Sequence, residues 1–299
     1  MCEEKAKFIM KTIRMNCKYI FQNTVRIAGM VYSAVTVIFT FASWDDLGIS
    51  DLSYRILALL AILAISILAG GTYTLFFQKI RSLWSCGGRS ISVRYLNMLK
   101  IAFFKKRSGE KIMIIPVNTG FDTIVDSDPE QKDPLVSPKS LHGQWIKQMN
   151  RHGVTVEELN RRIKTYLDAN YPGKAVIIKK DRGNNFSYPY GTTVVMHHRK
   201  VTFLLLAISK FDEHNVAQSN LEEYRNCLKK IIRLCHDNGQ GYDLYIPLMG
   251  TKLSGLNLSH KGALEMITSA LIFYSDKLRG KVNVVIYPGD RDKVTIFDV

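Results

Sequence analysis

The sequence lacks the residue patterns that hold a metal ion or activate a nucleophile. Its five cysteines form no C-x-x-C pair, and no H-E-x-x-H pattern occurs, so a protein-bound metal is not expected. The G-x-S-x-G turn of serine hydrolases is also missing. An odd number of cysteines without secretory features indicates reduced thiols in a cytosolic environment. The sequence therefore gives no support to a metalloenzyme, a serine hydrolase or a disulfide-stabilised secreted protein.

Charge is absent from two long runs near the N-terminus, residues 27–44 and 56–78. A membrane-spanning helix needs ~20 apolar residues, so we predict one in each run. A buried helix is the alternative for the first, shorter run. A cleaved signal peptide is not expected, because no small-x-small cleavage site follows and the second run comes at once. Neither run contains Asp, Glu, Lys, Arg or His, so this pair by itself offers no ion or proton relay.

Basic residues flank the two runs on one side of the predicted membrane. Residues 1–26 carry six Lys or Arg and residues 79–109 carry eight, whereas the connector 45–55 has three aspartates and only Arg55. The positive-inside rule then places both flanks in the cytoplasm and the connector outside. We predict a two-helix hairpin in the inner (plasma) membrane, with a basic N-terminal segment and a basic connector to the folded domain. Because the basic excess lies beside the spans, anionic lipid is the expected contact and nucleic acid is not.

Residues 110–299 alternate between strand and helix patterns. Runs such as 201–208 and 282–286 are apolar on both faces, which requires cover on both sides of a sheet. The run VTIF at 294–297 is expected to close the domain as a last strand. The expected helix N-caps are Thr155, Ser219 and Ser259. These features predict a three-layer α/β/α sandwich with a mixed sheet.

The stretch GTKLSG at residues 250–255 lies between an apolar strand and a helix expected from Ser259. It has the glycine spacing of a P-loop but lacks the Lys-Ser/Thr pair after the second glycine, so triphosphate hydrolysis is not supported. A strand, a glycine turn and a helix N-terminus together offer free N–H groups to an anion, which suits a diphosphate. A plain structural turn is the alternative for this loop taken alone.

A second loop of the same kind follows the strand IMIIPVN. That strand ends at Asn118, and Ser140 is expected to cap the next helix, which opens with His142 and Gly143. Two loops that each join a strand end to a helix start favour an anion held between them.

The order of five segments, IPVN, SLHGQWI, YPYGTTVV, FLLLAISKFDEHNVA and PLMGTKLSGLNLS, resembles the macrodomain fold over residues 110–299. This resemblance implies binding of ADP-ribose or a relative. Asn118 matches the Asn after the first core strand, and residues 250–255 match the diphosphate loop. His142–Gly143 stands where a glycine-rich loop belongs, although this loop is not glycine-rich here. Asp122 is the nearest acidic residue to match the adenine-contacting Asp of the fold.

Ligand-binding residues are expected in both loops, and no catalytic or metal-binding residue is assigned. The candidates are Asn118, Phe121, Asp122, Ser140, Leu141, His142, Gly143, Gly250, Thr251, Lys252, Leu253, Ser254, Gly255 and Leu256.

A macrodomain behind a two-span anchor resembles the membrane effector of a type II Thoeris anti-phage system. The resemblance implies a functional partner, a TIR-domain protein that converts NAD into an ADP-ribose conjugate such as an amino-acid–ADP-ribose. It also implies that the bound signal drives oligomerisation, membrane disruption and abortive infection. The nucleotide is then a signalling ligand, and no cofactor is expected.

Catalysis is the main alternative to sensing. An ADP-ribosyl hydrolase needs a base near the distal ribose, and Asp122 and His142 are the candidates, although each suits ligand binding better. A membrane-anchored, ADP-ribose-binding adaptor is the other alternative. A sensor must bind its ligand more tightly in one assembly state than in another. Gly70 and Gly71 suit close packing of hairpin helices in such an assembly.

Overall fold

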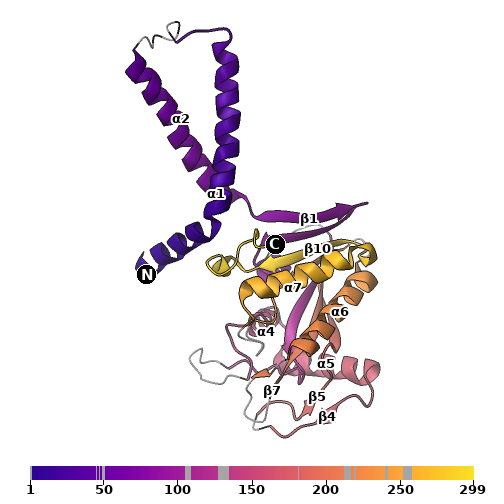
Figure 1. The fold of residues 1–299 in the computed structure, drawn as a ribbon. Helices are drawn as coiled ribbons and strands as arrows, with labels where there is room; N and C mark the ends of the chain where they lie inside the picture. The colour runs from indigo at the N-terminus through magenta and orange to yellow at the C-terminus, as the bar shows by residue number, and fades with distance from the viewer. Residues whose placement is uncertain are drawn as a thin grey trace. The chain divides into compact units, whose positions relative to one another are not determined.

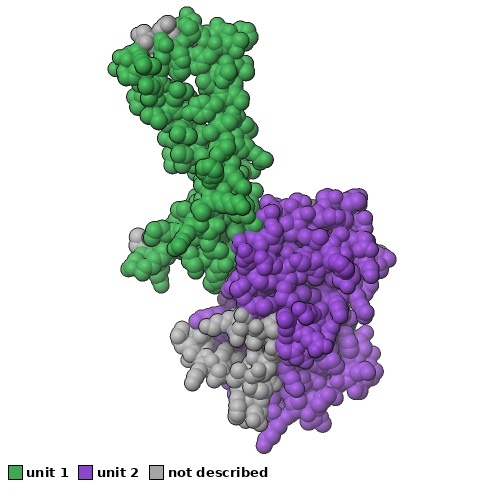
Figure 2. All heavy atoms as spheres, in the orientation of Figure 1, with its two compact units in different colours: residues 1–79, 289–297 green, residues 80–288, 298–299 purple. Residues whose placement is uncertain are grey.

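The computed structural model describes residues 2–44, 46, 48, 51–104, 109–126, 135–180, 182–211, 217–218, 220–239, 242–251 and 258–299. The chain divides into two compact units, coloured separately in Figure 2 and each described by itself. The first comprises Met1–Lys79 and Gly289–Phe297, and the second comprises Ile80–Pro288 and Asp298–Val299.

Two long helices form most of the first unit (Figure 1). Helix α1 (Cys2–Phe39) is followed by α2 (Leu52–Thr72), which continues directly as the π-helix η1 (Tyr73–Phe77). Among the described residues, one helical run is long and apolar enough to cross a membrane, namely Leu52–Phe77, which contains an 18-residue stretch with a mean hydropathy of 2.3. This run covers nearly all of the second predicted span.

The first predicted span, residues 27–44, extends past the end of its helix. Helix α1 ends at Phe39, whose ring packs on that of Trp44 with centroids 4.3 Å apart, so the chain turns back on itself there. Asp46 fixes the turn, because its Oδ2 accepts hydrogen bonds from both the backbone N and the Oγ of Ser43. The apolar run is therefore part helix and part turn.

Gly70 lets the two helices approach each other closely. A Cβ at Gly70 would lie 2.8 Å from the backbone N and Cα of Thr24, closer than real side chains permit. A Cβ at the neighbouring Gly71 would meet only Ile20, at 3.9 Å. Beside this contact, Asn23 Nδ2 of α1 donates to Thr74 Oγ1 at 2.8 Å. Of the two glycines, Gly70 is the one that the packing of α1 on α2 requires.

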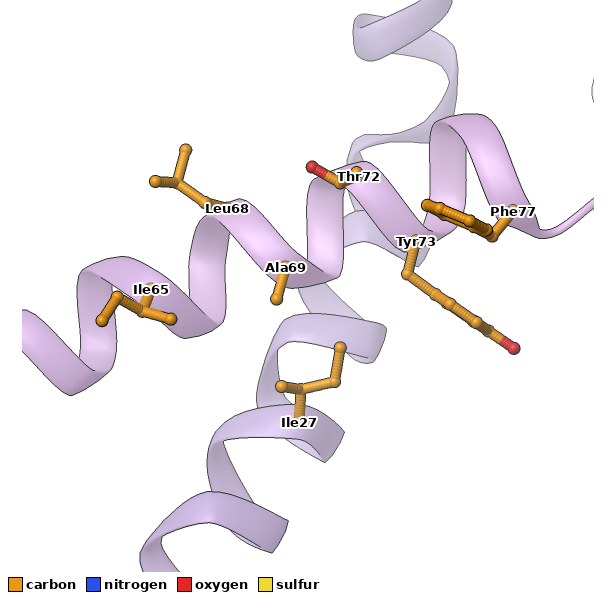
Figure 3. A pocket seen from close by; sticks show the side chains of 7 residues that line it. All are labelled: Ile27, Ile65, Leu68, Ala69, Thr72, Tyr73 and Phe77. Carbon is orange, nitrogen blue, oxygen red and sulfur yellow. The ribbon is translucent and has the colours of Figure 1, made fainter.

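An apolar hollow of about 590 Å³ lies beside this crossing, within the first unit. Figure 3 shows Ile27 of α1 directed toward Ala69 of α2, with Leu68, Thr72 and Tyr73 along the same stretch. Because its walls are almost wholly apolar, the hollow suits a hydrocarbon rather than water.

The C-terminal strap, which we define as Gly289–Phe297, belongs to the first unit and packs on α1. The rings of Tyr19 and Phe297 stack with centroids 4.1 Å apart, and Tyr19 also donates to the Phe297 carbonyl at 2.8 Å. Thr295, which is fully buried, donates to Asn16 Oδ1 at 2.7 Å. Arg291 donates to the carbonyl of Leu75 in η1 at 3.1 Å. The strap thus contacts both helical segments.

A mixed β-sheet is the centre of the second unit. The strand order is β1-β2-β10-β9-β3-β7-β6, and β8 pairs with β7. Strands β2, β10, β9, β3 and β7 run parallel, while β1 and β6 pair antiparallel at the two edges. The strands are β1 (Ile80–Cys86), β2 (Arg89–Tyr95), β3 (Lys111–Asn118), β6 (Thr193–His198), β7 (Val201–Phe211), β8 (Ala217–Gln218), β9 (Asp243–Pro247) and β10 (Lys281–Ile286). A separate small sheet pairs β4 (Val176–Ile177) with β5 (Phe186–Ser187).

Helices cover both faces of the sheet, as the two-sided apolar strands require. On one face, α3 (Met98–Phe103), α4 (Leu141–Arg151) and α5 (Val156–Asn170) form one core with the side chains of Met113, Ile115 and Phe203. Side chains alternate along a strand, so Ile112, Ile114 and their neighbours face the other layer. That layer is α6 (Leu221–Asn238) and α7 (His260–Phe273), which lie together over the sheet in Figure 1. The predicted three-layer sandwich with a mixed sheet is confirmed.

Four local expectations differ from the structure. The predicted connector 79–109 includes β1, β2 and α3, because the pair Gly87–Gly88, with φ of +54° and +77°, makes a tight hairpin that brings both strands onto the sheet. Residues 294–297, which were predicted to form a strand, are not a strand; they lie in the strap and pack on α1. Only Val176–Ile177 of the run KAVIIK is strand. Asn220 caps α6, and Ser219 lies outside the described residues.

Candidate functional site

The candidate site lies where the chain leaves β3 and β9 in opposite directions. These two parallel strands are neighbours, paired through residues 111–113 and 243–245. After β3 the chain crosses to α4 on one face, and after β9 it crosses to α7 on the other. In open parallel sheets, ligands bind beyond the carboxyl ends of two such strands, because the loops diverge there and leave a crevice. The described parts of the two loops are residues 118–126 after β3 and residues 248–251 and 258–259 after β9.

The first loop is built around Asp122. Asn118, the last residue of β3, donates from Nδ2 to Asp122 Oδ2 at 2.5 Å and accepts from Asp122 N at 3.0 Å. Lys180 Nζ lies 2.9 Å from Asp122 Oδ2, and both side chains are 1% exposed. Asn184 N donates to Asp122 Oδ1 at 2.7 Å, and its side-chain amide donates to the carbonyl of Gly120. The carboxylate therefore joins the loop after β3 to residues 180–184.

Phe121 is held in an unusual backbone conformation inside this loop. Its φ is +50°, in the left-handed region that residues other than glycine seldom adopt. Its side chain is 1% exposed and meets the ring of Tyr188 edge-on, with centroids 6.1 Å apart. Tyr188 N in turn donates to the carbonyl of Thr119. Backbone strain of this kind persists only where the surroundings fix it, and it is concentrated at binding sites.

Helix α4 begins at the same end of the sheet with a capped and tightly packed turn. Ser140 Oγ accepts from Gly143 N at 3.0 Å, as predicted for a cap. A Cβ at Gly143 would lie 3.2 Å from Pro138 Cα and closer still to the carbonyl of Ser137, so glycine is required by this loop contact. His142 is 7% exposed beside Trp145, and burial lowers the pKa of His142 to about 3. The imidazole is therefore neutral at physiological pH.

The second loop starts at Gly250 and ends at the cap of α7. Gly250 has a φ of +84°, and a Cβ there would lie 3.0 Å from the ring of Tyr224 on α6. Tyr224 supports the loop by donating to the carbonyl of Met249 at 2.9 Å. Leu258 N donates to the carbonyl of Gly250, which closes the loop at its base. Ser259 Oγ then accepts from Gly262 N and caps α7.

Chemically, this arrangement suits an anion. Helices α4 and α7 both start at the carboxyl edge of the sheet, and the first N–H groups of a helix have no partner within the helix. Their dipoles also favour negative charge at that end. Helix termini of this kind, one after each of the two loops, are a chemistry that can hold a diphosphate.

The structure places the described site residues in the loop after β3, in the first turn of α4 and at the start of the loop after β9. Asn118, Phe121, Asp122, His142, Gly143 and Gly250 are buried, while Ser140, Leu141 and Thr251 are half-buried. The predicted residues Lys252, Leu253, Ser254, Gly255 and Leu256 lie outside the described residues. Ligand contact by these residues stays a prediction.

Sequence reasoning missed the segment that supports the first loop. Lys180 and Asn184 bind Asp122, and Arg182 pairs with Asp126. Residues 181–191 are a polar stretch that contains glycine, asparagine, tyrosine and proline, and this sequence offers no spacing rule that links it to Asp122. The glycine at position 183 was the available indication that the backbone is constrained there. In the structure its φ is +85°, and a Cβ would lie 2.5 Å from Asp122 Oδ1.

Comparison with known families gives a match over most of the second unit. The family model described as "Thoeris protein ThsA, Macro domain" matches residues 91–287, which is more than half of the chain. The chain belongs to the Thoeris ThsA macrodomain family. The predicted resemblance to a Thoeris macrodomain protein is therefore confirmed, and the anti-phage role and the binding of ADP-ribose-type ligands come with the family.

Individual relatives give more distant matches. The Thoeris protein ThsA of Bacillus amyloliquefaciens (strain Y2) is 25% identical over 280 residues, which cover 90% of this chain and 86% of the relative. A macrodomain mutant of Oceanobacillus iheyensis with ADPR is 11% identical, with a TM-score of 0.45, over 71% of this chain and 92% of that one. The same macrodomain with ADP gives 12% identity and a TM-score of 0.44 over the same shares.

Proposed function

We propose that this member of the Thoeris ThsA macrodomain family is a membrane effector that senses a nucleotide. Its macrodomain binds an ADP-ribose-derived signal, such as an amino-acid–ADP-ribose, which a TIR-domain partner makes from NAD. Binding drives oligomerisation of the chain in the membrane, and the assembled helices disrupt the bilayer and end the infected cell. The observation that carries this proposal is that the neighbouring parallel strands β3 and β9 are each followed by a loop and a helix with a side-chain N-cap, in a chain of the Thoeris ThsA macrodomain family.

The helical unit supports the membrane part of the proposal. The run Leu52–Phe77 has the length and hydropathy of a span. Three hydroxyl groups in these helices are satisfied within the helix, since Ser33, Thr36 and Ser66 each donate to the carbonyl four residues earlier. Such groups enter hydrocarbon without an unpaired donor. With α1 as its partner, this run makes the proposed two-span hairpin, and the basic flanks place both chain ends and the macrodomain in the cytoplasm.

Sensing is favoured over catalysis by the state of the two candidate bases. The pKa of His142 falls to about 3 because the imidazole is buried beside Trp145, so its proton affinity is low. Asp122 already accepts hydrogen bonds from Asn118, Lys180 and Asn184. A general base needs a lone pair directed at its substrate. Asp122 instead holds the loop and His142 is buried against Trp145, which suits a binding site that keeps its ligand intact.

The connection between the two units supports a mechanical link from ligand to membrane. Strand β10 ends at Ile286, at the carboxyl edge of the sheet that carries the site, and the strap begins three residues later. The strap contacts α1 through Tyr19 and Asn16. A ligand that binds one arrangement of this edge more tightly than another shifts the population toward the arrangement that it prefers. The proposal keeps the domain division predicted from the sequence, in which a two-helix membrane hairpin precedes the macrodomain.

Two measurements test the proposed function. The full chain in detergent micelles is incubated with ADP-ribose and amino-acid–ADP-ribose, and the nucleotides are then analysed by mass spectrometry; recovery of unchanged ligand fits a sensor, and cleavage products fit a hydrolase. In cells that also express an active TIR enzyme, the variant Gly250→Glu is expected to stop membrane damage while the protein still inserts. Undiminished damage by that variant would argue against the diphosphate loop.

A further inference from the structure

The N-terminal part of α1, residues 5–25, has a buried face that is polar. Thr12, Asn16 and Thr24 are 9%, 3% and 8% exposed. Asn16 donates to the carbonyl of Thr12 and accepts from Thr295 of the strap. In a soluble amphipathic helix the apolar stripe is buried and the polar face is in water. This helix shows the reverse arrangement.

The apolar side chains of the same segment are left uncovered. Ile9, Met10, Ile13 and Phe21 are 54%, 67%, 41% and 68% exposed, and Cys17 is exposed between the last two. Residues 9, 13, 17 and 21 are four apart, so they follow one side of the helix. Large apolar side chains that gather on one exposed side mark a surface that another apolar phase covers.

Basic side chains border this apolar side. Lys7, Lys11, Arg14 and Lys18 are spaced three or four residues apart and form a second stripe next to it. Lys7 pairs with Glu3, and Lys11 reaches Asp292 of the strap at 3.4 Å with 58% of its side chain exposed. An apolar stripe beside a basic stripe is the pattern of a helix that lies in the surface of an anionic membrane.

We propose that residues 5–25 of α1 lie in the headgroup region of an anionic lipid surface, with the apolar stripe in the lipid and the strap clasping the opposite, polar face. The inference rests on the proposed membrane hairpin and adds a second, surface-bound membrane contact. Figure 1 shows that α1 changes direction along its length, as a helix does when it passes from a surface to a span, and the last residues of the segment, Asn23 and Thr24, already contact η1 and α2.

Lipid fits the stripe better than a second copy of the chain does. Two copies joined by this side would bring their basic stripes together, and like charges repel. The same helix also continues into the part of α1 where Met30 and Val37 are each 60% exposed beside α2. An apolar surface that is continuous with a proposed span meets the same bilayer.

The test uses the full chain with a nitroxide spin label on Cys17, in the background Cys2→Ser and Cys86→Ser. Cys227 and Cys235 are each 1% exposed, and burial raises the pKa of both thiols to about 12, so they stay unlabelled. The protein is placed in vesicles of phosphatidylcholine and phosphatidylglycerol. Collision of the label with oxygen, which dissolves in lipid, is compared with collision with a water-soluble nickel complex. Matched labels at Lys18→Cys and Leu63→Cys, each with Cys17→Ser, report the basic stripe and α2.

The oxygen-to-nickel collision ratio at Cys17 is expected to be several-fold higher than at Lys18→Cys, and to fall in vesicles of phosphatidylcholine alone. Equal ratios at the two positions, with Leu63→Cys still shielded from nickel, would overturn the surface helix but leave the hairpin standing. Nickel access at Leu63→Cys would overturn the hairpin and this inference together. Spin–spin broadening at Cys17, with shielding from both reagents, would show that a second copy covers the stripe and would also overturn it. A ratio that does not change without phosphatidylglycerol would overturn the preference for anionic lipid.

Discussion

Lys180 Nζ and Asp122 Oδ2 are 2.9 Å apart, and each side chain is 1% exposed. Removal of one member of a buried ion pair leaves a charge in a poorly solvating interior, at a cost of about 3–5 kcal/mol. We therefore expect Asp122→Asn, which keeps the shape of the side chain, to lower the free energy of unfolding by this amount. Denaturation of the full chain in nanodiscs, followed by tryptophan fluorescence, measures it.

The pair Lys11–Asp292 provides a matched control for that substitution. It is also a lysine–aspartate contact, at 3.4 Å, but the lysine side chain is 58% exposed. Exposed pairs contribute up to about 1 kcal/mol, so Asp292→Asn is expected to have a small effect. Equal losses in the two variants would contradict a structural role for Asp122. Adding Lys180→Met to Asp122→Asn is expected to recover part of the loss, because it removes the buried charge.

Gly250 is expected to be necessary for ligand binding. Gly250→Ala puts a Cβ 3.0 Å from Tyr224 at a φ of +84°, so the loop must shift away from the ligand. The control is Gly153→Ala, which has the same φ of +84° but open space around its Cβ. Both variants incur the backbone cost of about 1 kcal/mol, but Gly250→Ala alone is expected to weaken ADP-ribose binding by at least about tenfold, or ~1.4 kcal/mol. Calorimetric titration that gives the same affinity for both variants would contradict the loop assignment.

Stability is expected to fall in mildly acidic solution because of His142. Its pKa drops from 6.5 to about 3 on folding, since burial disfavours the imidazolium. A depressed folded pKa contributes stability that is fully present above the unfolded value and is lost as the pH falls toward the folded value. Between ~pH 7.5 and ~pH 5.5 the loss from this group is about 1 kcal/mol.

His142→Gln removes the titrating group, so its stability is expected to change less over the same pH interval than that of the natural chain. Thermal denaturation at several pH values measures the two slopes. The interval stays above the range in which most carboxylates titrate. Parallel slopes would show that His142 takes up its proton as readily in the folded protein as in the unfolded one.

Gly70 and Gly71 are adjacent on α2 but are expected to respond differently to a side chain. Gly70→Val forces α2 away from Thr24, because even a single carbon there lies 2.8 Å from the Thr24 backbone, whereas Gly71→Val meets only Ile20 at 3.9 Å. Overpacking costs about 1–3 kcal/mol, so Gly70→Val is expected to open the helix pair and Gly71→Val to leave it intact. Distances between spin labels on α1 and α2 measure this. A closed helix pair in both variants would contradict the packing described here.

Local capping chemistry made much of the second unit predictable. Ser140, Thr155 and Ser259 accept hydrogen bonds from backbone N–H groups three residues ahead, as their positions before apolar periodic runs predicted. The strand ending at Asn118 and the hairpin of β6 and β7 were predictable from their apolar residues. These features depend on residues that are close in sequence, where propensity and periodicity decide the outcome.

Long-range partners decided what could not be predicted. The run at 294–297 has the composition of a strand, yet Thr295 bonds to Asn16 and Phe297 stacks on Tyr19, some 280 residues away. The basic residues around Gly87–Gly88 suggested a connector in solvent, and nothing in them indicated a hairpin at the edge of the sheet. In the candidate site, Asp122 was predicted to meet a ligand, but nothing in the sequence showed that Lys180 would reach it.

The most direct test of the central claim is to measure the melting temperature and the assembled mass of the full chain in detergent micelles. The measurement is made with NAD, with ADP-ribose and with an extract of cells in which a TIR enzyme is active. A ligand that binds the folded state alone stabilises it by ~2.7 kcal/mol at a hundredfold excess over its Kd. The account predicts a higher melting temperature and a larger assembly with ADP-ribose or the extract, with the ligand recovered intact. An unchanged melting temperature and mass under all three conditions would contradict it.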